Sequence, residues 1–425
     1  MPAVWDGRRP LFRGARYGTP WLAGPGVRGV FYARCVTLAR FSVDLIADPV
    51  PGDALHRLLA GARSAPVFPE ASLLGIPARV IARFDALKAF FADDEQFPGG
   101  ASYQFMVEPA VGPTFISMDG AEHDRFRRLA TPAFRSQRVT RWVDDELVPL
   151  AHEIVDRFAD RGEADLVTSF SSVLPLWAIS RKLGLPMGSE DRQRVWTAAL
   201  LSHPVDPTGA AVAKQEVFEF LAPILEQRRR EPGDDVLSHL LEYEHDGTRM
   251  TDEQIINHIR LLYVVGAATT SDGLSILLYH VLTRPEMLER AADGPEMCER
   301  LVVESLRYEP PVAVLPRVVA NAGVIGDTEL PAGSLVLCAI AGANRDPEMF
   351  PDPDRFDPDR DLRETLTFGF GSKFCPGAHL ARRQMTAALH VLVSRLPNLR
   401  LVEATEPTGG ILRSCRQLRA TWDTR

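Results

Sequence analysis

Cys375 ends a glycine-rich, aromatic-flanked loop and is the side chain best placed to do chemistry in this sequence. The loop covers residues 368–374, and Pro376 follows the cysteine, which is compatible with the first turn of a helix. Backbone N–H groups at a helix start lower the pKa of a thiol and can donate hydrogen bonds to its sulfur. Glycines let the backbone approach a flat partner closely. These residue types predict a metal-bound thiolate, and haem iron held by Cys is one of the standard axial arrangements.

This segment resembles the haem-binding signature of the cytochrome P450 family, Phe-Gly-x-Gly-x-(His/Arg)-x-Cys-x-Gly. Phe368, Gly369, Cys375 and Gly377 match fixed positions of the pattern. The resemblance implies haem b (iron protoporphyrin IX) with Cys375 as the metal ligand, and Phe368, Gly369 and Gly377 beside the cofactor. Lys373 stands where the family has His or Arg. Lys acts as a point charge, so it would hold a haem propionate less directionally than a bidentate Arg.

The resemblance also implies partners for the two haem propionates. His123 and Arg127 have the i, i+4 spacing of the family's His-x-x-x-Arg helix, and Arg317 matches an arginine on a later strand. Together with Lys373, these residues are the expected cofactor-binding cations.

A third matching segment is Glu304-Ser305-Leu306-Arg307, the Glu-x-x-Arg pattern, in which the i, i+3 spacing puts both charges on one helix face. Arg355 corresponds to the arginine of the family's Pro-Glu-Arg-Phe region. By resemblance, Glu304, Arg307 and Arg355 form a buried charge network beneath the haem loop. Its expected role is in folding and cofactor assembly, because breaking a buried ion pair costs about 3–5 kcal/mol.

A long helix must lie opposite the Cys loop. Thr251 and Gln254 form a capping-box pattern, and a largely apolar stretch then runs to Thr283, before an Arg-Pro pair. The small residues at 266–270 can leave room for a cofactor face. The same residues would also suit a tight helix crossing, and the Cys loop favours the first interpretation.

Ala268 departs from the family pattern at the point that matters for oxygen chemistry. The family's central helix has Asp or Glu before the Thr, and this chain has Ala268 followed by Thr269 and Thr270. Cleaving dioxygen needs two protons, which an acid–alcohol pair normally organises. Thr269 and Thr270 are the expected catalytic residues. Asp272, one turn on, could contribute, but a surface or capping role is the favoured interpretation.

The implied activity is that of a haem-thiolate monooxygenase, which inserts one oxygen atom from O2 into a small hydrophobic substrate. Because Ala268 replaces the acid, a peroxide-using or otherwise atypical enzyme (coupling, dehydration or nitric oxide chemistry) stays open, as does a non-catalytic haem-binding sensor. Substrates of the natural-product, terpenoid, steroid or fatty acyl classes would suit an apolar pocket. The resemblance assigns five residues to that pocket: Phe105, Phe115, Val265, Val314 and Ile411.

The 425 residues are helix-dominated with short β-like runs near residues 79–82, 318–325 and 334–340. We therefore expect a mainly α fold with a minor β region: the family's triangular prism, with one haem between the long helix and the Cys loop. Residues 1–50 are rich in Gly, Pro and Arg and are expected to form a loosely structured extension, with residues 51–425 as one catalytic domain. No apolar run predicts a membrane span. Five unpatterned cysteines favour a reducing compartment, which indicates a cytoplasmic protein.

The net charge of −8 argues against nucleic acid as a partner. Arginines nevertheless cluster at residues 125–138 and at 382–383, close to the Cys loop. Solvated helix faces would account for them, but in the family both segments lie on the face where acidic redoxins dock. The expected partners are therefore a ferredoxin and an NAD(P)H-dependent ferredoxin reductase, and the protein itself is expected to be a monomer.

Overall fold

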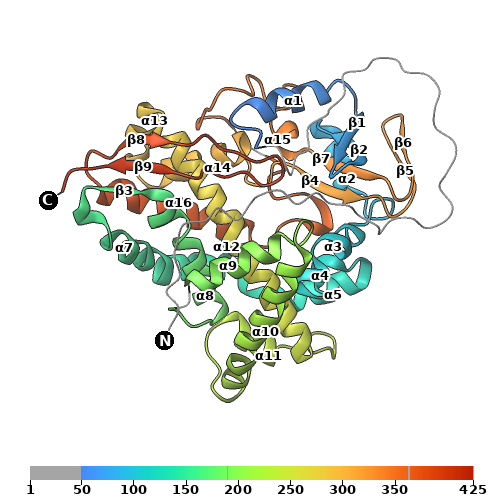
Figure 1. Cartoon of the computed structure of the whole chain (residues 1–425), viewed down its shortest axis with the longest axis horizontal. Helices are drawn as coiled ribbons and strands as arrows, with labels where there is room; N and C mark the ends of the chain where they lie inside the picture. The colour runs from blue at the N-terminus through green and yellow to red at the C-terminus, as the bar shows by residue number, and fades with distance from the viewer. Residues whose placement is uncertain (1–48, 189, 362–363, 425) are drawn as a thin grey trace, which may run out of the picture. The chain divides into compact units, whose positions relative to one another are not determined.

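The computed structural model describes residues 49–188, 190–361 and 364–424. Helices dominate these residues and the strands form small sheets, which confirms the expected mainly α fold with a minor β region (Figure 1). The extension expected over residues 1–50 lies outside the described residues except for its last two positions.

The helix α12 (Asp252–Leu282) runs through the middle of the described fold, and its 31 residues match the predicted long helix. Its start is fixed locally. Thr251 accepts a hydrogen bond from the Gln254 N–H, and the Gln254 side chain accepts one from the Thr251 N–H, so the predicted capping box is present. Gly266 faces the neighbouring helix α8 (Leu174–Leu183), where an added Cβ would lie 2.9 Å from the Ile179 side chain. One side of the small-residue segment therefore serves a tight helix crossing.

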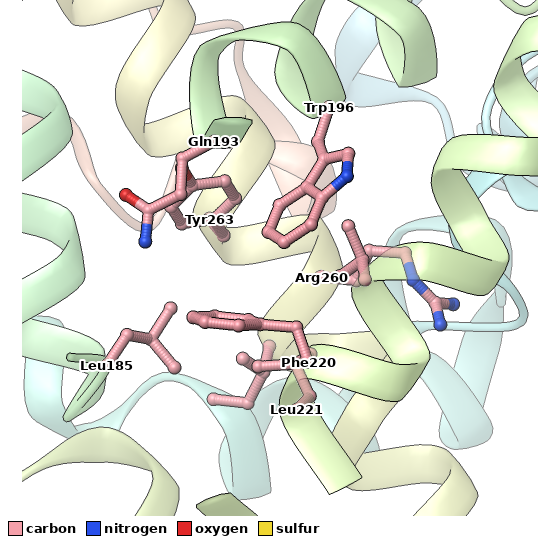
Figure 2. A pocket seen from close by; sticks show the side chains of 9 residues that line it. Leu185, Gln193, Trp196, Phe220, Leu221, Arg260 and Tyr263 are labelled. Atoms are coloured by element: carbon pink, nitrogen blue, oxygen red, sulfur yellow. The ribbon is translucent and has the colours of Figure 1, made fainter. Parts of the chain in front are cut away.

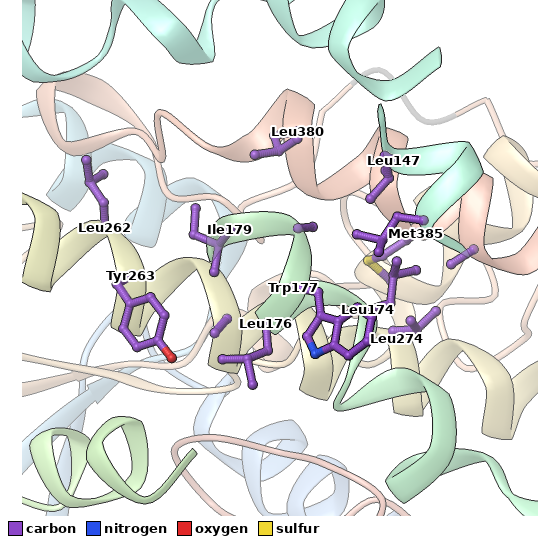
Figure 3. Close-up of a cluster of buried hydrophobic side chains, with 14 of the residues drawn as sticks. Leu147, Leu174, Leu176, Trp177, Ile179, Leu262, Tyr263, Leu274, Leu380 and Met385 are labelled. Carbon is purple, nitrogen blue, oxygen red and sulfur yellow. The ribbon is translucent and has the colours of Figure 1, made fainter. Parts of the chain in front are cut away.

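The main hydrophobic core surrounds α12. Side chains of α8, α12 and α16 (Ala378–Arg395) interlock there, among them Trp177, Leu274 and Met385 (Figure 3). Helix α14 (Pro295–Tyr308) packs against both α12 and α16. This core holds the long helix and the helix that follows the Cys loop in one rigid arrangement.

The other α-helices of the described residues pack around this core or beside the main sheet (Figure 1). They are α1 (Ala54–Ala62), α2 (Phe84–Ala92), α3 (Gly100–Met106), α4 (Glu108–Val111), α5 (Gly120–Ala130), α6 (Ser136–Trp142), α7 (Val148–Asp156), α9 (Glu190–Leu201), α10 (Pro207–Arg230), α11 (Val236–Glu242), α13 (Pro285–Ala291) and α15 (Ile340–Ala343).

Three small sheets complete the described part of the fold. The largest has the order β1 (Phe68–Leu73), β2 (Ile76–Ile81), β7 (Leu335–Cys338), β4 (Leu315–Val318), with β2 and β7 parallel and the other pairs antiparallel. The others are β3 (Glu163–Asp165), β9 (Leu418–Thr421), β8 (Arg400–Ala404) and the hairpin β5 (Gly323–Ile325), β6 (Thr328–Leu330). The predicted run 318–325 is thus divided between β4 and β5. In the β4–β7 register, Arg317 stands opposite Val336.

Among the described residues, α12 alone is long and apolar enough to cross a membrane, and 67% of its most apolar window is buried inside the protein. This burial is that of a core helix.

Candidate functional site

Cys375 lies in a closed loop directly before α16. Its backbone N–H donates to the Phe368 carbonyl oxygen over 2.9 Å. Gly371, at φ +72°, brings the loop against α2, where an added Cβ would lie 2.4 Å from the Phe91 carbonyl oxygen. Helix α16 begins at Ala378, so the proline after Cys375 lies in the turn before the helix. The sequence pattern instead suggests the first turn of the helix for this proline.

Two opposing influences act on the Cys375 thiol. Burial raises its pKa, whereas hydrogen bonds from the N–H groups of Gly377 and Ala378 and the charge of Arg127 favour the thiolate. The predicted amide donors are therefore present, but burial outweighs them in the protein chain by itself. A metal ion at the sulfur would deprotonate the thiol outright.

The four predicted propionate partners come from α5, β4 and the Cys loop, and they lie close to one another. The Arg127 guanidinium donates to the Phe374 carbonyl oxygen inside the loop. Burial, and then the charge of Lys373, lower the pKa of His123. Burial also lowers the pKa of Lys373, with a smaller contribution from Arg317. The structure thus gathers these cations beside Cys375.

Some donors in this group have no protein acceptor. Nε and Nη1 of Arg317 are buried without a hydrogen-bond partner. Nε2 of His123 also lacks a partner, but Nδ1 of this ring lies 3.3 Å from the Asp124 carboxylate and carries the proton, so Nε2 of the neutral ring is an acceptor. Buried donors in folded proteins are nearly always satisfied. An anionic ligand with carboxylates on one edge, such as haem with its two propionates, would satisfy them. The residues present therefore fit a haem with its propionates at β4 and α5 and its iron at Cys375.

Lys373 has a protein partner that the sequence did not indicate. Its ammonium donates to the Met118 carbonyl oxygen and lies 3.4 Å from the Asp119 carboxylate. Asp119 also accepts from the Gly100 N–H over 2.9 Å. By its position directly before α5, Asp119 would be interpreted as that helix's N-cap, yet its side chain caps nothing there. It holds Lys373 instead.

The Glu304–Arg307 pair forms as predicted, but Arg355 does not join it. Arg307 donates to both Glu304 oxygens over 2.7 and 2.8 Å, and both side chains are fully buried. The Arg355 side chain is 67% exposed and pairs with Asp357. Only its carbonyl oxygen enters the network, as an acceptor from Arg307. The second cation of the network is Arg360, whose guanidinium lies 3.8 Å from Glu304.

In the middle of α12, one face of the helix is not fully covered by other side chains. Val265, a large apolar residue in an otherwise buried stretch, is 37% exposed, and Ala268, Thr269 and Asp272 are partly exposed. These positions recur at i, i+3, i+4 and i+7 and so share one side of the helix. The Thr269 hydroxyl donates to the Val265 carbonyl oxygen over 2.8 Å. Thr270, the other predicted catalytic residue, is buried away from this face.

The predicted substrate residues separate into three groups. Val265 is on the open face of α12, and Ile411 is partly buried. Phe115 and Val314 are 4% and 0% exposed and belong to hydrophobic clusters, so the protein itself fills their surroundings. Phe105, at 69% exposed, lies on the solvent side of α3. The resemblance indicates which segments lie near a pocket, but it does not indicate in which direction each side chain points.

A separate cavity of about 10 Å³ lies between α9, α10 and α12, with Trp196 and Phe220 on its wall (Figure 2). Such a volume holds about one water molecule. Arg260 borders it, and its buried guanidinium donates to the Val111 carbonyl oxygen over 2.7 Å. This cavity is a packing gap beneath α10 and is too small for an organic substrate.

The two arginine-rich segments meet on the surface next to the Cys loop. Helix α6 packs against α16, where Thr140 and His379 approach to 3.4 Å. Four arginines of this region are exposed: Arg125, Arg128, Arg135 and Arg138. Phe374 of the Cys loop is itself 41% exposed.

Comparison with known proteins gives consistent matches. The cytochrome P450 family model matches residues 204–293 and 296–403. Cytochrome P450 107B1 of Saccharopolyspora erythraea is 32% identical over 378 residues, covering 85% of this chain and 93% of that protein. The monooxygenase PikC of Streptomyces venezuelae is 33% identical, covering 86% of this chain and 88% of that protein. The solved structure of CYP109Q5 from Chondromyces apiculatus superposes with a TM-score of 0.80 at 27% identity, covering 91% of this chain and 100% of that chain.

Since these relatives align along most of their length and the cationic group beside Cys375 suits haem propionates, the chain belongs to the cytochrome P450 family, whose members are monooxygenases that bind haem b.

Proposed function

We propose that this protein inserts one oxygen atom from O2 into a small hydrophobic natural product, with Cys375 as the thiolate ligand of haem b. The observation that carries the proposal is the joint position of a buried cysteine with two amide donors and a buried arginine, Arg317, two of whose nitrogen atoms lack acceptors. A structural cysteine needs neither.

Each residue of the site has a distinct task in this proposal. When bound, the haem supplies the redox-active iron at which dioxygen is reduced and the substrate is oxidised. Cys375 would hold the iron, while Gly377 and Ala378 donate N–H groups to the sulfur. Arg317 would bind a propionate through its free donors, and His123 would do so in its protonated form, with Nε2 as the donor.

On the opposite side, Thr269 would orient a water molecule that carries a proton. Its hydroxyl donates to the Val265 carbonyl oxygen. The lone pairs of the hydroxyl oxygen are then free to accept a hydrogen bond from water on the open face of α12. Val265 and Ile411 offer apolar surface to a substrate. Water exclusion by these side chains strengthens any polar interaction within the site.

The relatives support an oxygen-inserting reaction in biosynthesis. Their names include a mycinamicin IV hydroxylase/epoxidase, at 32% identity, and a nocardicin C N-oxygenase, at 34% identity. A natural product of similar biosynthetic origin is the substrate class we propose for this chain. Residues 51–425 would form the catalytic domain, acting as a monomer in the cytoplasm.

For the electrons we propose a ferredoxin and its NAD(P)H-dependent reductase. The exposed arginines of α5 and α6 beside Phe374 support an acidic partner at this surface. Reversing the charge of Arg125 and Arg128 is expected to slow reduction of the haem and weaken its dependence on salt.

The ligand assignment is tested by the optical spectrum of the reduced carbonyl complex. The wild-type protein is expected to give the strongly red-shifted Soret band of a haem thiolate. Cys375→Ala should abolish that band, and Cys298→Ala, which changes a cysteine buried elsewhere, should leave it intact. A red-shifted band in Cys375→Ala would refute the assignment.

Ala268 supports a second candidate, a peroxide-using enzyme, because the acid that normally precedes the threonine is absent. Product formation with NADPH, reductase and ferredoxin, but not with peroxide alone, supports the monooxygenase. The reverse pattern supports the second candidate. Haem binding without turnover in either assay would indicate the sensor.

A further inference from the structure

Asp272, in the second half of α12, has surroundings unlike those of any other carboxylate that the structure describes. It is the one acidic residue between Ile255 and Leu282. It is partly buried, neither a surface residue nor a cap, which corrects the interpretation favoured from the sequence. Within the described residues, its side chain has no ion pair or hydrogen bond. The Ser275 hydroxyl donates to the backbone carbonyl oxygen of Asp272 and not to its carboxylate. Burial raises the pKa of this carboxyl to about 7.

Helix geometry puts Asp272 between the positions of Ala268 and Thr269. Each residue advances a helix by roughly 100° and 1.5 Å. Asp272 therefore lies about 6 Å along the axis from Ala268 and about 40° around it, and about 60° from Thr269 on the other side. Val265, exposed on the same face, marks this side as open. The carboxyl thus occupies the open face one turn beyond the position where the family pattern has its acid.

The groups that face Asp272 do not neutralise it. The Cys415 thiol interacts with Asp272, but burial raises the pKa of this thiol to about 12, so it stays protonated. Beyond Cys415, Glu309 and Arg413 form an ion pair with each other. At the next position of the helix, Gly273, the neighbouring side chains are Met385 of α16 and Pro311 of the turn after α14, and neither of them titrates. A carboxyl in such surroundings keeps its proton up to neutral pH and can give it to a water molecule.

We infer that Asp272 takes the place of the acid missing at position 268 and delivers protons to dioxygen through water molecules that the Thr269 hydroxyl holds in position. The inference rests on the proposed monooxygenase function. It makes Asp272 a positioning residue for proton delivery, since it acts through Thr269 and water and does not touch the substrate.

The reaction balances with the partners already named. A substrate C–H bond, O2, two electrons and two protons yield an alcohol and water. NAD(P)H supplies the electrons through the ferredoxin. For each proton, the Asp272 O–H bond breaks, the proton passes to water and on to the oxygen that leaves as water, and bulk solvent reprotonates the carboxylate. The O–O bond breaks as this water leaves, and the remaining oxygen atom then enters the substrate C–H bond, so that C–H breaks and C–O and O–H form.

The test compares Asp272→Asn, Asp272→Glu and the double variant Ala268→Asp with Asp272→Asn. Ser271→Ala is the matched control, because its hydroxyl donates to the Ala267 carbonyl oxygen on another side of α12. The measurement is product formed per NADPH consumed, between pH 6 and about 8.5. We expect wild-type coupling to fall as the pH rises through about 7, the pKa of Asp272. Asp272→Asn should be about a hundredfold less coupled, the low end for loss of a general acid, and independent of pH.

Two further results separate proton delivery from a structural role. Asp272→Glu should keep part of the coupling, and the double variant should regain it, because the acid returns at position 268. Independently of turnover, infrared spectra of the reduced carbonyl complex should show a protonated carboxyl band that titrates near pH 7 and is absent from Asp272→Asn.

Unchanged coupling and an unchanged pH profile in Asp272→Asn would overturn the inference, as would a double variant no better than Asp272→Asn. Each variant is first checked for the red-shifted carbonyl band and for a substrate-induced spectral shift. If those are present and coupling does not respond, only the inference on Asp272 fails. If the wild-type protein lacks the band or turns over with peroxide alone, the proposed function fails instead.

Discussion

At the scale of single residues, Arg317 is the clearest sign that this site is built for a ligand. Its guanidinium is buried on β4, and two of its nitrogen atoms lack acceptors. Lys373, by contrast, is already held by Asp119 and the Met118 carbonyl. Arg317 is therefore the cation with the most binding capacity left for a propionate.

Arg317→Leu is expected to release haem about ten- to a hundredfold faster than the wild type, because a hydrogen bond to a charged group contributes about 1.5–3 kcal/mol. The haem-free variant should be at least as stable as the haem-free wild type, since the substitution removes an unpartnered buried charge. Haem transfer to an excess of an apo-globin measures the first quantity, and urea unfolding the second.

Arg317→Lys should lie between the two, because it keeps the charge but not the fork of donors. Arg355→Ala, on the exposed surface, is the control and should release haem at the wild-type rate. Wild-type haem retention in Arg317→Leu would show that the free donors face something other than a propionate.

At the scale of elements, α14 is attached to the segment after α15 through Glu304 and Arg307. Arg307 donates to carbonyl oxygens of three residues in that segment, those of Asn344, Pro353 and Arg355. The pair therefore fixes the chain that leads into the Cys loop. Its contribution is to the fold, since neither side chain reaches Cys375.

Glu304→Gln is expected to destabilise the protein by about 3–5 kcal/mol, because it leaves the Arg307 charge buried without a counterion. Arg355→Ala should cost no more than about 1 kcal/mol, as for an exposed ion pair. Midpoints of urea unfolding, taken on haem-loaded protein, compare the two. Equal losses would restore Arg355 to the network.

The same elements show what the sequence can and cannot predict. The start of α12 follows from a capping box, whose partners are three residues apart, and the pairing of Glu304 with Arg307 on α14 follows from their i, i+3 spacing. The assignment of Arg355 to the buried network is wrong because the segment around Arg355 has no regular periodicity from which the buried side chains could be predicted. The burial of Arg360 and the attachment of Lys373 to Asp119 depend on contacts between distant segments, which one sequence does not encode locally.

At the scale of the whole molecule, the Cys loop joins separate hydrophobic clusters. Phe368 packs against the large helical cluster around α12, and Phe370 packs against a second cluster formed by α2 and the main sheet. The loop is thus positioned from both sides. Ionisable groups buried in different parts of the fold then determine how the stability of this arrangement varies with pH.

Two of these groups are histidines that the fold holds neutral. Burial lowers the pKa of His258 to about 4 and that of His280 to about 3. The Phe115 N–H donates to His258 Nε2 over 3.1 Å, and the opposite ring nitrogen is bonded to the Gln254 carbonyl oxygen, which requires a neutral ring. In the unfolded chain these rings take up a proton below about pH 6.5. Their contribution to stability is therefore complete above that pH and is lost on acidification.

Asp272 acts in the opposite direction, because its folded pKa of about 7 lies above the ordinary value of 3.8. Ionising it favours the unfolded chain, so it lowers stability as the pH rises through this range. We therefore expect the free energy of unfolding to fall from pH 6.5 to 4, but less steeply than in Asp272→Asn, which lacks the opposing group. His258→Gln should flatten the same curve, by on the order of 3 kcal/mol over this range. Urea unfolding of the three proteins at matched ionic strength measures these slopes. If the slope of Asp272→Asn equals that of the wild type, the Asp272 carboxyl is already ionised in the folded protein at pH 4.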